Sequence, residues 1–243
     1  RAVARTSDGQ VRYAGLPSIS TSTRLFVEEE RDHDEYQRSY YIHSNYGRQF
    51  NDGLSRLLAY RCAQEVNTNV QVAVADHGFT LSMPLNRKVD LPGVLADIRP
   101  GAVRADLRAA LDGTDILKRY FRINATRSLM ILKRYKGHEK SAAQQQVSSE
   151  MLLSWAQELD EFAVAEETYR EILEDKLDVS AVEQFIGSLS ETIEVIHRQT
   201  DSPTPRAFGL ATLMASDVVL AEDESAVLQE FHRRVLAELD EED

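Results

Sequence analysis

The sequence predicts an α+β fold in which an antiparallel sheet with hairpins and a helix-rich half form one compact unit. Three observations predict it: short β-favouring runs fill the first third of the 243 residues, helical periodicity dominates the remainder, and one strand-like run returns late. No internal repeat or long linker divides the chain. We expect a loose leading segment over residues 1–21, the domain over residues 22–239 and an acidic tail over residues 240–243.

The first expected elements are strands. TRLFVEEE (residues 23–30) and RSYYIHS (residues 38–44) are β-favouring runs separated by a polar connection, and we expect them to pair antiparallel. A helix follows over residues 47–66, because its apolar residues recur at the spacing of one helical face. In residues 70–84, two alternating arms flank the turn sequence DHG, which predicts a hairpin.

The second half is expected to be mostly helical. After a helix over residues 102–111, a long helix begins at Thr114 and ends at Gly137, with Lys118, Arg122 and Lys133 projecting together on one face. The next helix covers residues 142–159, and its apolar residues predict a buried face made of Val147, Met151, Leu152, Trp155 and Leu159.

Four further elements complete the chain. Helices over residues 162–177 and 180–189 are divided near Asp178, with Ser180 as the expected cap. The run TIEVIHR alternates like a strand, residues 202–220 are expected to form a proline-introduced helix and a short apolar run, and a closing amphipathic helix covers residues 222–239.

Composition and motifs exclude several classes of protein. No run approaches the roughly 18 apolar residues that a membrane span requires, and the single cysteine, Cys62, rules out an internal disulfide. The phosphate-binding pattern of ATPases is absent, as are GxGxxG, GxSxG and HExxH, and no two of the six histidines are spaced as zinc ligands. We therefore expect no catalytic residue, no metal site and no cofactor on this chain.

A basic island stands out in an acidic protein. Residues 104–140 carry ten Lys and Arg against four Asp and Glu, in a chain whose net charge is −12. One explanation is a solvated face paired with the abundant acids, and the other is a surface whose arginines bridge backbone phosphates. Tyr120, Phe121 and Tyr135 interleave with the charges and could stack on bases, although aromatics at helical spacing are more often core.

Several ordered stretches resemble one family. FRINATRSLMILKRYKG is followed closely by QQQVSSEMLL and YREILEDKLDV, while HSNYGRQFNDGLSRLLAYR and VAVADHGFTLSMP precede it and SDVVLAEDESAVLQEFHRRVL comes after. Together these are similar to the DEAD/H-associated C-terminal module of large helicase-related (Lhr-type) proteins. Arg206 departs from the family pattern, which more usually has an aromatic residue there.

The resemblance implies an accessory domain of a superfamily 2, ATP-dependent helicase that moves 3′ to 5′ on DNA and acts in DNA repair. ATP and Mg²⁺ would then be bound by motor domains outside this chain. The implied partners are single-stranded DNA or an RNA:DNA hybrid and the RecA-like and winged-helix domains of the same polypeptide. The implied location is cytoplasmic and nucleoid-associated, with no membrane contact.

The expected phosphate contacts are the cations of the basic island and one residue at the start of the first helix. They are Arg48, Lys118, Arg119, Arg122, Arg127, Lys133, Arg134, Lys136 and Lys140. Two alternatives stay open: the domain braces the motor domains without touching DNA, or it contributes to base excision, for which Asp76 is an available acid.

Overall fold

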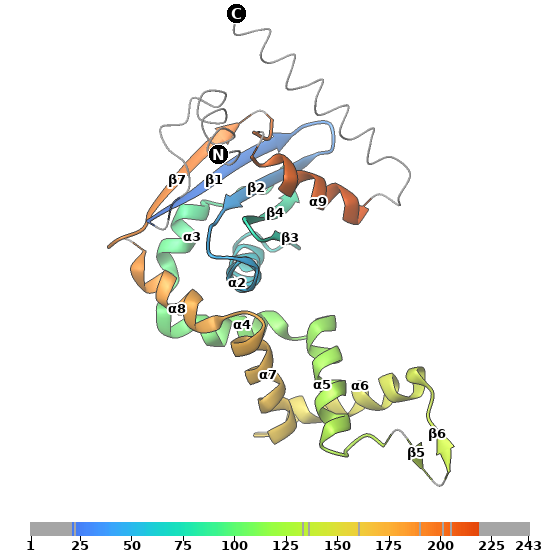
Figure 1. Ribbon diagram of the computed structural model, residues 1–243. Coiled ribbons are helices and arrows are strands. Elements are labelled where there is room, and N and C mark those ends of the chain that lie inside the picture. Colours follow the sequence, from blue (N-terminus) through green and yellow to red (C-terminus); the bar gives the residue numbers. More distant parts are fainter. Residues whose placement is uncertain are drawn as a thin grey trace, which may run out of the picture.

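The computed structural model describes residues 21–218 except residues 22, 133, 136, 160, 190, 201 and 205 (Figure 1). A five-stranded sheet lies at one end of the molecule, and a helical arm extends away from it. The arrangement confirms the α+β class. The leading segment, the last expected helix (residues 222–239) and the acidic tail lie outside the described residues, apart from the end of the leading segment at Thr21.

The sheet contains both predicted strand pairs. Its strands, in spatial order, are β3 (Gln71–Ala75), β4 (Gly78–Pro84), β2 (Gln37–His43), β1 (Arg24–Asp32) and β7 (Glu194–Thr200). Neighbours are antiparallel except β1 and β7, which run parallel. The returning strand is therefore confirmed, and it completes the sheet beside β1.

Both faces of the sheet are covered. Tyr40 and Ile42 on β2 belong to the main hydrophobic core, whereas Tyr41 between them packs with Leu210 of helix α9 (Phe208–Val218) on the opposite face. Successive side chains of a strand point to opposite faces, so the apolar run of β2 needs a layer on each side. In Figure 1, α2 (Arg48–Val66) and α9 provide these layers.

Helix α2 confirms the first predicted helix and passes very close to a neighbouring loop. A Cβ added at Gly53 would lie 2.3 Å from the carbonyl oxygen of Leu177. Glycine at this position therefore lets the helix and the loop come into contact.

The arm is built from short helices. The helical elements after β4 are α3 (Leu91–Asp97), which lies beside the sheet, and then the 3₁₀ turn η1 (Pro100–Ala102), α4 (Val103–Leu111), α5 (Asp115–Arg127), α6 (Ala142–Glu158), α7 (Ala163–Asp175) and α8 (Val179–Ser188). Helix α3 was not expected from the sequence. Helix α8 is capped by Asp178, whose Oδ1 accepts from the Ala181 amide at 3.3 Å, and not by the predicted Ser180.

The predicted long helix from Thr114 to Gly137 is wrong, because α5 ends at Arg127. Ser128 donates from its hydroxyl to the Asn124 carbonyl at 2.8 Å, and Leu129 adopts a left-handed conformation with φ of 60°. The Met130 and Ile131 amides then both donate to the Ala125 carbonyl, which closes the helix end. A short hairpin follows instead, formed by β5 (Arg134–Tyr135) and β6 (His138–Glu139).

The predicted buried face of α6 is also wrong. Four of its five residues are more than half exposed: Val147, Met151, Trp155 and Leu159. The helix instead buries Ser149, Leu153 and Ala156. Two small side chains on this face allow α6 to approach its neighbours closely, and the large apolar side chains face solvent.

Among the described residues, no helix is long and apolar enough to cross a membrane.

Candidate nucleic-acid interface

Helix α5 carries the densest group of predicted phosphate contacts, and its buried face fixes how it is oriented. Thr114 caps the helix by accepting from the Leu117 amide at 3.4 Å. Leu117, Phe121 and Ala125 are fully buried, and the Asn124 amide donates to Glu171 on α7 at 2.9 Å. The remaining sides of α5 therefore carry its charges at the surface.

The four cations of α5 are held only loosely by acids. Lys118 lies 3.8 Å from Asp115, and Arg127, which is 69% exposed, lies 3.9 Å from Glu171. Arg119 is exposed and Arg122 half-buried, and no ion pair of either is recorded within the described part of the chain. Exposed pairs at such distances contribute little free energy, so these charges are available to an external anion.

The β5–β6 hairpin places more positive charge beyond α5. Arg134 is 74% exposed and lies 3.9 Å from Glu139, its partner in the strand register. Gly137 forms the turn with φ of 83°, a conformation that favours glycine. Lys140 follows and is half-buried, whereas Lys133 and Lys136 lie outside the described residues.

Two other members of the basic island are structural. Arg104 lies 2.7 Å from Glu174, and Arg108 donates to Glu166 at 2.8 Å while its guanidinium lies 4.0 Å from the centre of the Tyr169 ring. The hydrogen bonds from Arg108 lower the pKa of the Glu166 carboxyl. Arg104 and Arg108 are therefore paired with acids, as the first of the two explanations of the basic island expects.

Arg48 is separated from the α5 group. It is the first residue of α2, beside the sheet, and α4 and α7 lie between α2 and α5 in Figure 1. Its side chain is exposed. The structure therefore brings together Lys118, Arg119, Arg122 and Arg127, extends this group toward Arg134 and Lys140, and leaves Arg48 as a distant cation.

The aromatic residues of the basic island differ in how accessible they are. Phe121 is fully buried and belongs to the core. Tyr120 is half-buried, and its ring lies between Arg119 at 5.3 Å and Lys176 at 5.8 Å. Of these two rings, only Tyr120 can offer an edge to a base.

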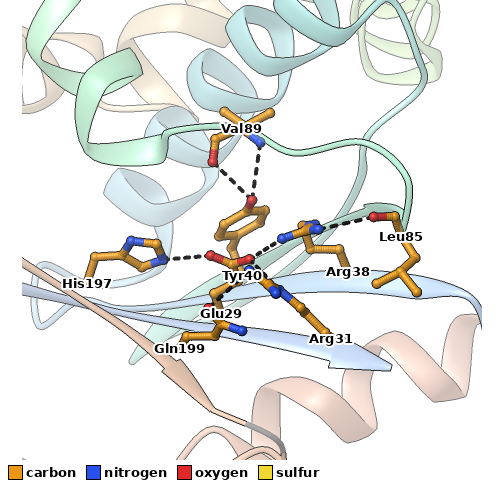
Figure 2. A network of polar contacts seen from close by, with 8 residues as sticks. All are labelled: Glu29, Arg31, Arg38, Tyr40, Leu85, Val89, His197 and Gln199. Atoms are coloured by element: carbon orange, nitrogen blue, oxygen red, sulfur yellow. Dashed lines mark hydrogen bonds and ion pairs between the residues drawn. The ribbon is translucent and has the colours of Figure 1, made fainter. Parts of the chain in front are cut away.

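The sequence reading missed a buried polar network on β1 (Figure 2). Glu29 is 2% exposed, pairs closely with Arg38 on β2, and lies 3.1 Å from His197 on β7. The Arg38 guanidinium also donates to the Leu85 carbonyl at 3.1 Å, and the Tyr40 hydroxyl donates to the Val89 carbonyl at 3.0 Å. The network ties three strands to the connection that leads into α3.

The neighbouring acids of β1 are buried on the opposite face. Glu28 is fully buried, with one carboxylate oxygen 2.6 Å from His43 Nε2 and 2.8 Å from the Thr204 hydroxyl. Glu30 accepts from the Tyr41 hydroxyl at 2.5 Å. All three consecutive glutamates of β1 are therefore buried, and the only sequence signal for their burial was the β-favouring run in which they stand.

Two acids stand out as candidates for catalysis among the described residues, Asp76 and Asp112. Asp76 is exposed in the β3–β4 turn, and burial together with nearby His43 lowers the pKa of the adjacent His77. A hollow between α4, α6 and α7 contains Asp112, which accepts from Tyr169 and thus already has a partner; burial raises the pKa of Tyr169 to about 12. In the part of the chain that the structure describes, no group of three His, Cys, Asp or Glu could hold a metal ion.

The DEAD/H associated family matches residues 19–207, which is most of the chain. The chain belongs to the DEAD/H associated family. The family match covers the whole sheet, the arm and the α5 cations. It stops just before α9, so the second layer of the sheet lies at its boundary.

Curated relatives of this DEAD/H associated domain are much longer proteins. It is 36% identical over 96% of its length to "ATP-dependent helicase Lhr-Core protein 2" of Thermococcus barophilus, and 38% identical over 88% to "ATP-dependent helicase Lhr-Core" of Saccharolobus solfataricus. It covers 26% and 25% of these relatives. The chain thus spans about a quarter of the length of the relatives it matches.

A solved structure has the same fold. The helicase Lhr of Mycobacterium smegmatis, bound to single-stranded DNA and AMP-PNP, aligns with a TM-score of 0.72 at 22% identity, covering 84% of this chain and 26% of that one. The arrangement of sheet and arm therefore also occurs within an Lhr helicase.

Proposed function

We propose that the chain is an accessory domain of an Lhr-type, ATP-dependent helicase and that the cations of α5 line part of its nucleic-acid path. The single observation that carries the proposal is that Lys118, Arg119, Arg122 and Arg127 on α5 have only distant acids or no recorded ion pair, whereas most other described arginines form close ion pairs. Phosphates would replace these weak acid contacts and release counterions.

The proposed substrate is single-stranded DNA or an RNA:DNA hybrid. ATP and Mg²⁺ would be bound by RecA-like domains elsewhere in the polypeptide, since this chain has no ATPase motif of its own and is proposed to be inactive as a motor. The proposed helicase moves 3′ to 5′ and acts in DNA repair. Support comes from the names of the relatives and from the DNA-bound neighbour. The proposed location is cytoplasmic and nucleoid-associated.

The test uses the full-length helicase that contains this chain. Arg119→Gln/Arg122→Gln removes two positive charges from α5, and we expect a loss of single-stranded DNA affinity of about tenfold and a salt slope shallower by about 1 to 2. The matched control, Arg87→Gln/Lys88→Gln, removes two exposed charges from the loop between β4 and α3.

Equal affinities and salt slopes for the two variants would refute the α5 contact. Cross-links from α5 to protein alone would favour the second candidate, a brace of the motor domains, because the same loosely paired cations could dock on an acidic protein surface.

A base-excision contribution is the weakest candidate. A relative named "Lhr helicase/uracil glycosylase" from Escherichia coli is 29% identical, but the chain covers only 14% of it. Asp76 is exposed in the turn between β3 and β4 and does not line the hollow between α4, α6 and α7.

A further inference from the structure

The outer face of α6 carries a continuous apolar stripe. Val147, Met151, Trp155 and Leu159 follow one another at intervals of four residues, and each is between 54% and 59% exposed. Residues four apart lie on one side of a helix, so Val147, Met151 and Trp155 form a single surface, and Leu159 is the exposed apolar residue that ends the helix. Isolated exposed apolar residues are ordinary, but a contiguous stripe with a tryptophan marks an interaction surface.

The stripe is formed before any partner arrives. Ser141 and Gln144 make a complete capping box, with hydrogen bonds of 3.2 Å and 3.0 Å, and Leu153 and Ala156 hold the opposite face in the core. The turn after α5 adds three exposed apolar residues to the same arm: Leu129, Met130 and Leu132. A preformed helical surface binds with a smaller ordering cost than a segment that must first fold.

The charges of α6 disfavour nucleic acid as the occupant. The helix carries two acids, Glu150 and Glu158, and no lysine or arginine. Phosphates would therefore be repelled along its length, in contrast to α5, and one tryptophan alone provides a single stacking position. The chemistry of the stripe fits an apolar protein surface.

The area of the stripe favours a tethered domain over a second copy of the chain as its partner. Its four side chains expose on the order of 400 Å², so two copies of the chain packed stripe to stripe would bury about 800 Å², whereas stable interfaces between separate chains bury about 1,200 Å² or more. A tethered domain needs less area, because a linker raises the effective concentration into the millimolar range. The relatives offer such domains, since the chain covers only about a quarter of them.

We propose that the α6 stripe docks on an apolar surface of another domain of the same helicase polypeptide. The proposal rests on the proposed function, because it requires that the chain be one domain of a longer helicase. It assigns the two sides of the arm different partners: α6 contacts protein, and α5 faces nucleic acid.

The first test places the photo-crosslinker p-benzoylphenylalanine at position 155 of the full-length helicase, with single-stranded DNA present. The expected product has the mass of one polypeptide, and its cross-link maps to a peptide outside residues 1–243. A product of two polypeptides, a product with DNA, a link only within residues 1–243, or no product would each overturn the proposal.

The second test uses substitutions that leave the net charge of the protein unchanged. In the full-length helicase, Met151→Gln/Trp155→Gln is expected to speed trypsin cleavage after the exposed Arg134 at least tenfold, because the arm loses its dock. The control Gln146→Ala alters an exposed residue of α6 outside the stripe and should leave the cleavage rate unchanged. Equal rates in the two variants would overturn the proposal.

The two proposals fail separately. ATP hydrolysis and unwinding are measured on the unmodified helicase in the same preparation. If both activities are present while position 155 gives no link outside residues 1–243, only the docking of α6 is refuted. If neither activity is present, the proposed function is refuted, whatever the cross-links show.

Discussion

The Thr204 hydroxyl donates to the Glu28 carboxylate at 2.8 Å, and the two residues are 176 positions apart in the sequence. The Thr204 amide donates to the other carboxylate oxygen at 3.2 Å, and His43 Nε2 lies 2.6 Å from the first. A fully buried carboxyl group thus joins β1 to the segment that leads into α9. The buried carboxyl group is tolerated because both of its oxygens have hydrogen-bond partners.

Glu28→Ala is expected to lower the free energy of unfolding by about 3 to 5 kcal/mol, because it leaves His43 and Thr204 buried without the carboxylate. Urea denaturation followed by circular dichroism measures the change. Glu194→Ala is the control, since Glu194 forms an exposed pair with Arg24 at 2.9 Å and should cost under about 1 kcal/mol. Similar losses of stability in the two variants would show that the buried contacts of Glu28 stabilise the fold no more than an exposed ion pair does.

Gly53→Ala is expected to destabilise the protein by about 1 to 3 kcal/mol, because the new methyl group would meet the Leu177 carbonyl and force α2 away from the loop. The matched control is Gly101→Ala, where an added Cβ has no atom within 4 Å. Thermal unfolding of both variants measures the difference. A Gly53→Ala protein as stable as the control would contradict the close approach.

Stability is expected to fall at alkaline pH, beginning near pH 9 and more steeply above pH 10. Burial raises the pKa of Tyr40 from 10.0 to about 12, so the folded protein keeps a proton that the unfolded chain releases. The stabilisation is complete below pH 10 and is lost as the pH rises toward 12, by at most about 1.4 kcal/mol per pH unit for each such group. Burial raises the pKa of Cys62 to about 12 as well, and its contribution begins to fall near pH 9.

Tyr40→Phe should make the alkaline decline in stability less steep, as measured by urea unfolding between pH 8 and pH 12. It also removes the hydrogen bond to Val89, so the slope against pH is the readout and not the absolute stability. Tyr36→Phe, at a 60% exposed position, should leave the slope unchanged. An unaltered slope for Tyr40→Phe would rule out this tyrosine as a cause.

Leu129→Gly is expected to raise the free energy of unfolding by about 0.5 to 1 kcal/mol, because glycine adopts the left-handed conformation at the end of α5 without steric cost. Met130→Gly is the control: its backbone is not left-handed, and the change should destabilise by a similar amount. Denaturant midpoints of the two variants should therefore move in opposite directions, and a shift in the same direction would contradict the assigned helix end.

Much of the sheet could be predicted because its signals are local. The β3–β4 hairpin follows from alternating apolar residues around a DHG turn, and α2 follows from apolar residues at helical spacing. The end of α5 could not be predicted in this way. A leucine takes the left-handed position that sequence rules assign to glycine, so the expected helix continued to Gly137.

The site was predictable in part for a related reason. Charge counting found the α5 cations, but it could not separate Arg119 and Arg122 from Arg104 and Arg108, whose acids come from α7 and α8. Helical periodicity likewise identified the apolar stripe of α6, but it could not show that this side of the helix is exposed. The hydrogen-bond partners of Glu28 come from β2 and from the segment after β7. No local sequence pattern predicts contacts between segments so far apart in the chain.

The parallel pairing of β7 with β1 has a consequence for biosynthesis. Strands β1 to β4 lie within residues 24–84 and can pair soon after they emerge from the ribosome, whereas β7 is made only at residues 194–200. Until then, β1 has an open edge, which is the kind of surface that promotes pairing between nascent chains. Two of the three buried glutamates of β1, Glu28 and Glu29, lack Thr204 and His197 as partners until those residues are made, so polar side chains stand on both faces of the open strand during synthesis and disfavour its pairing with another chain.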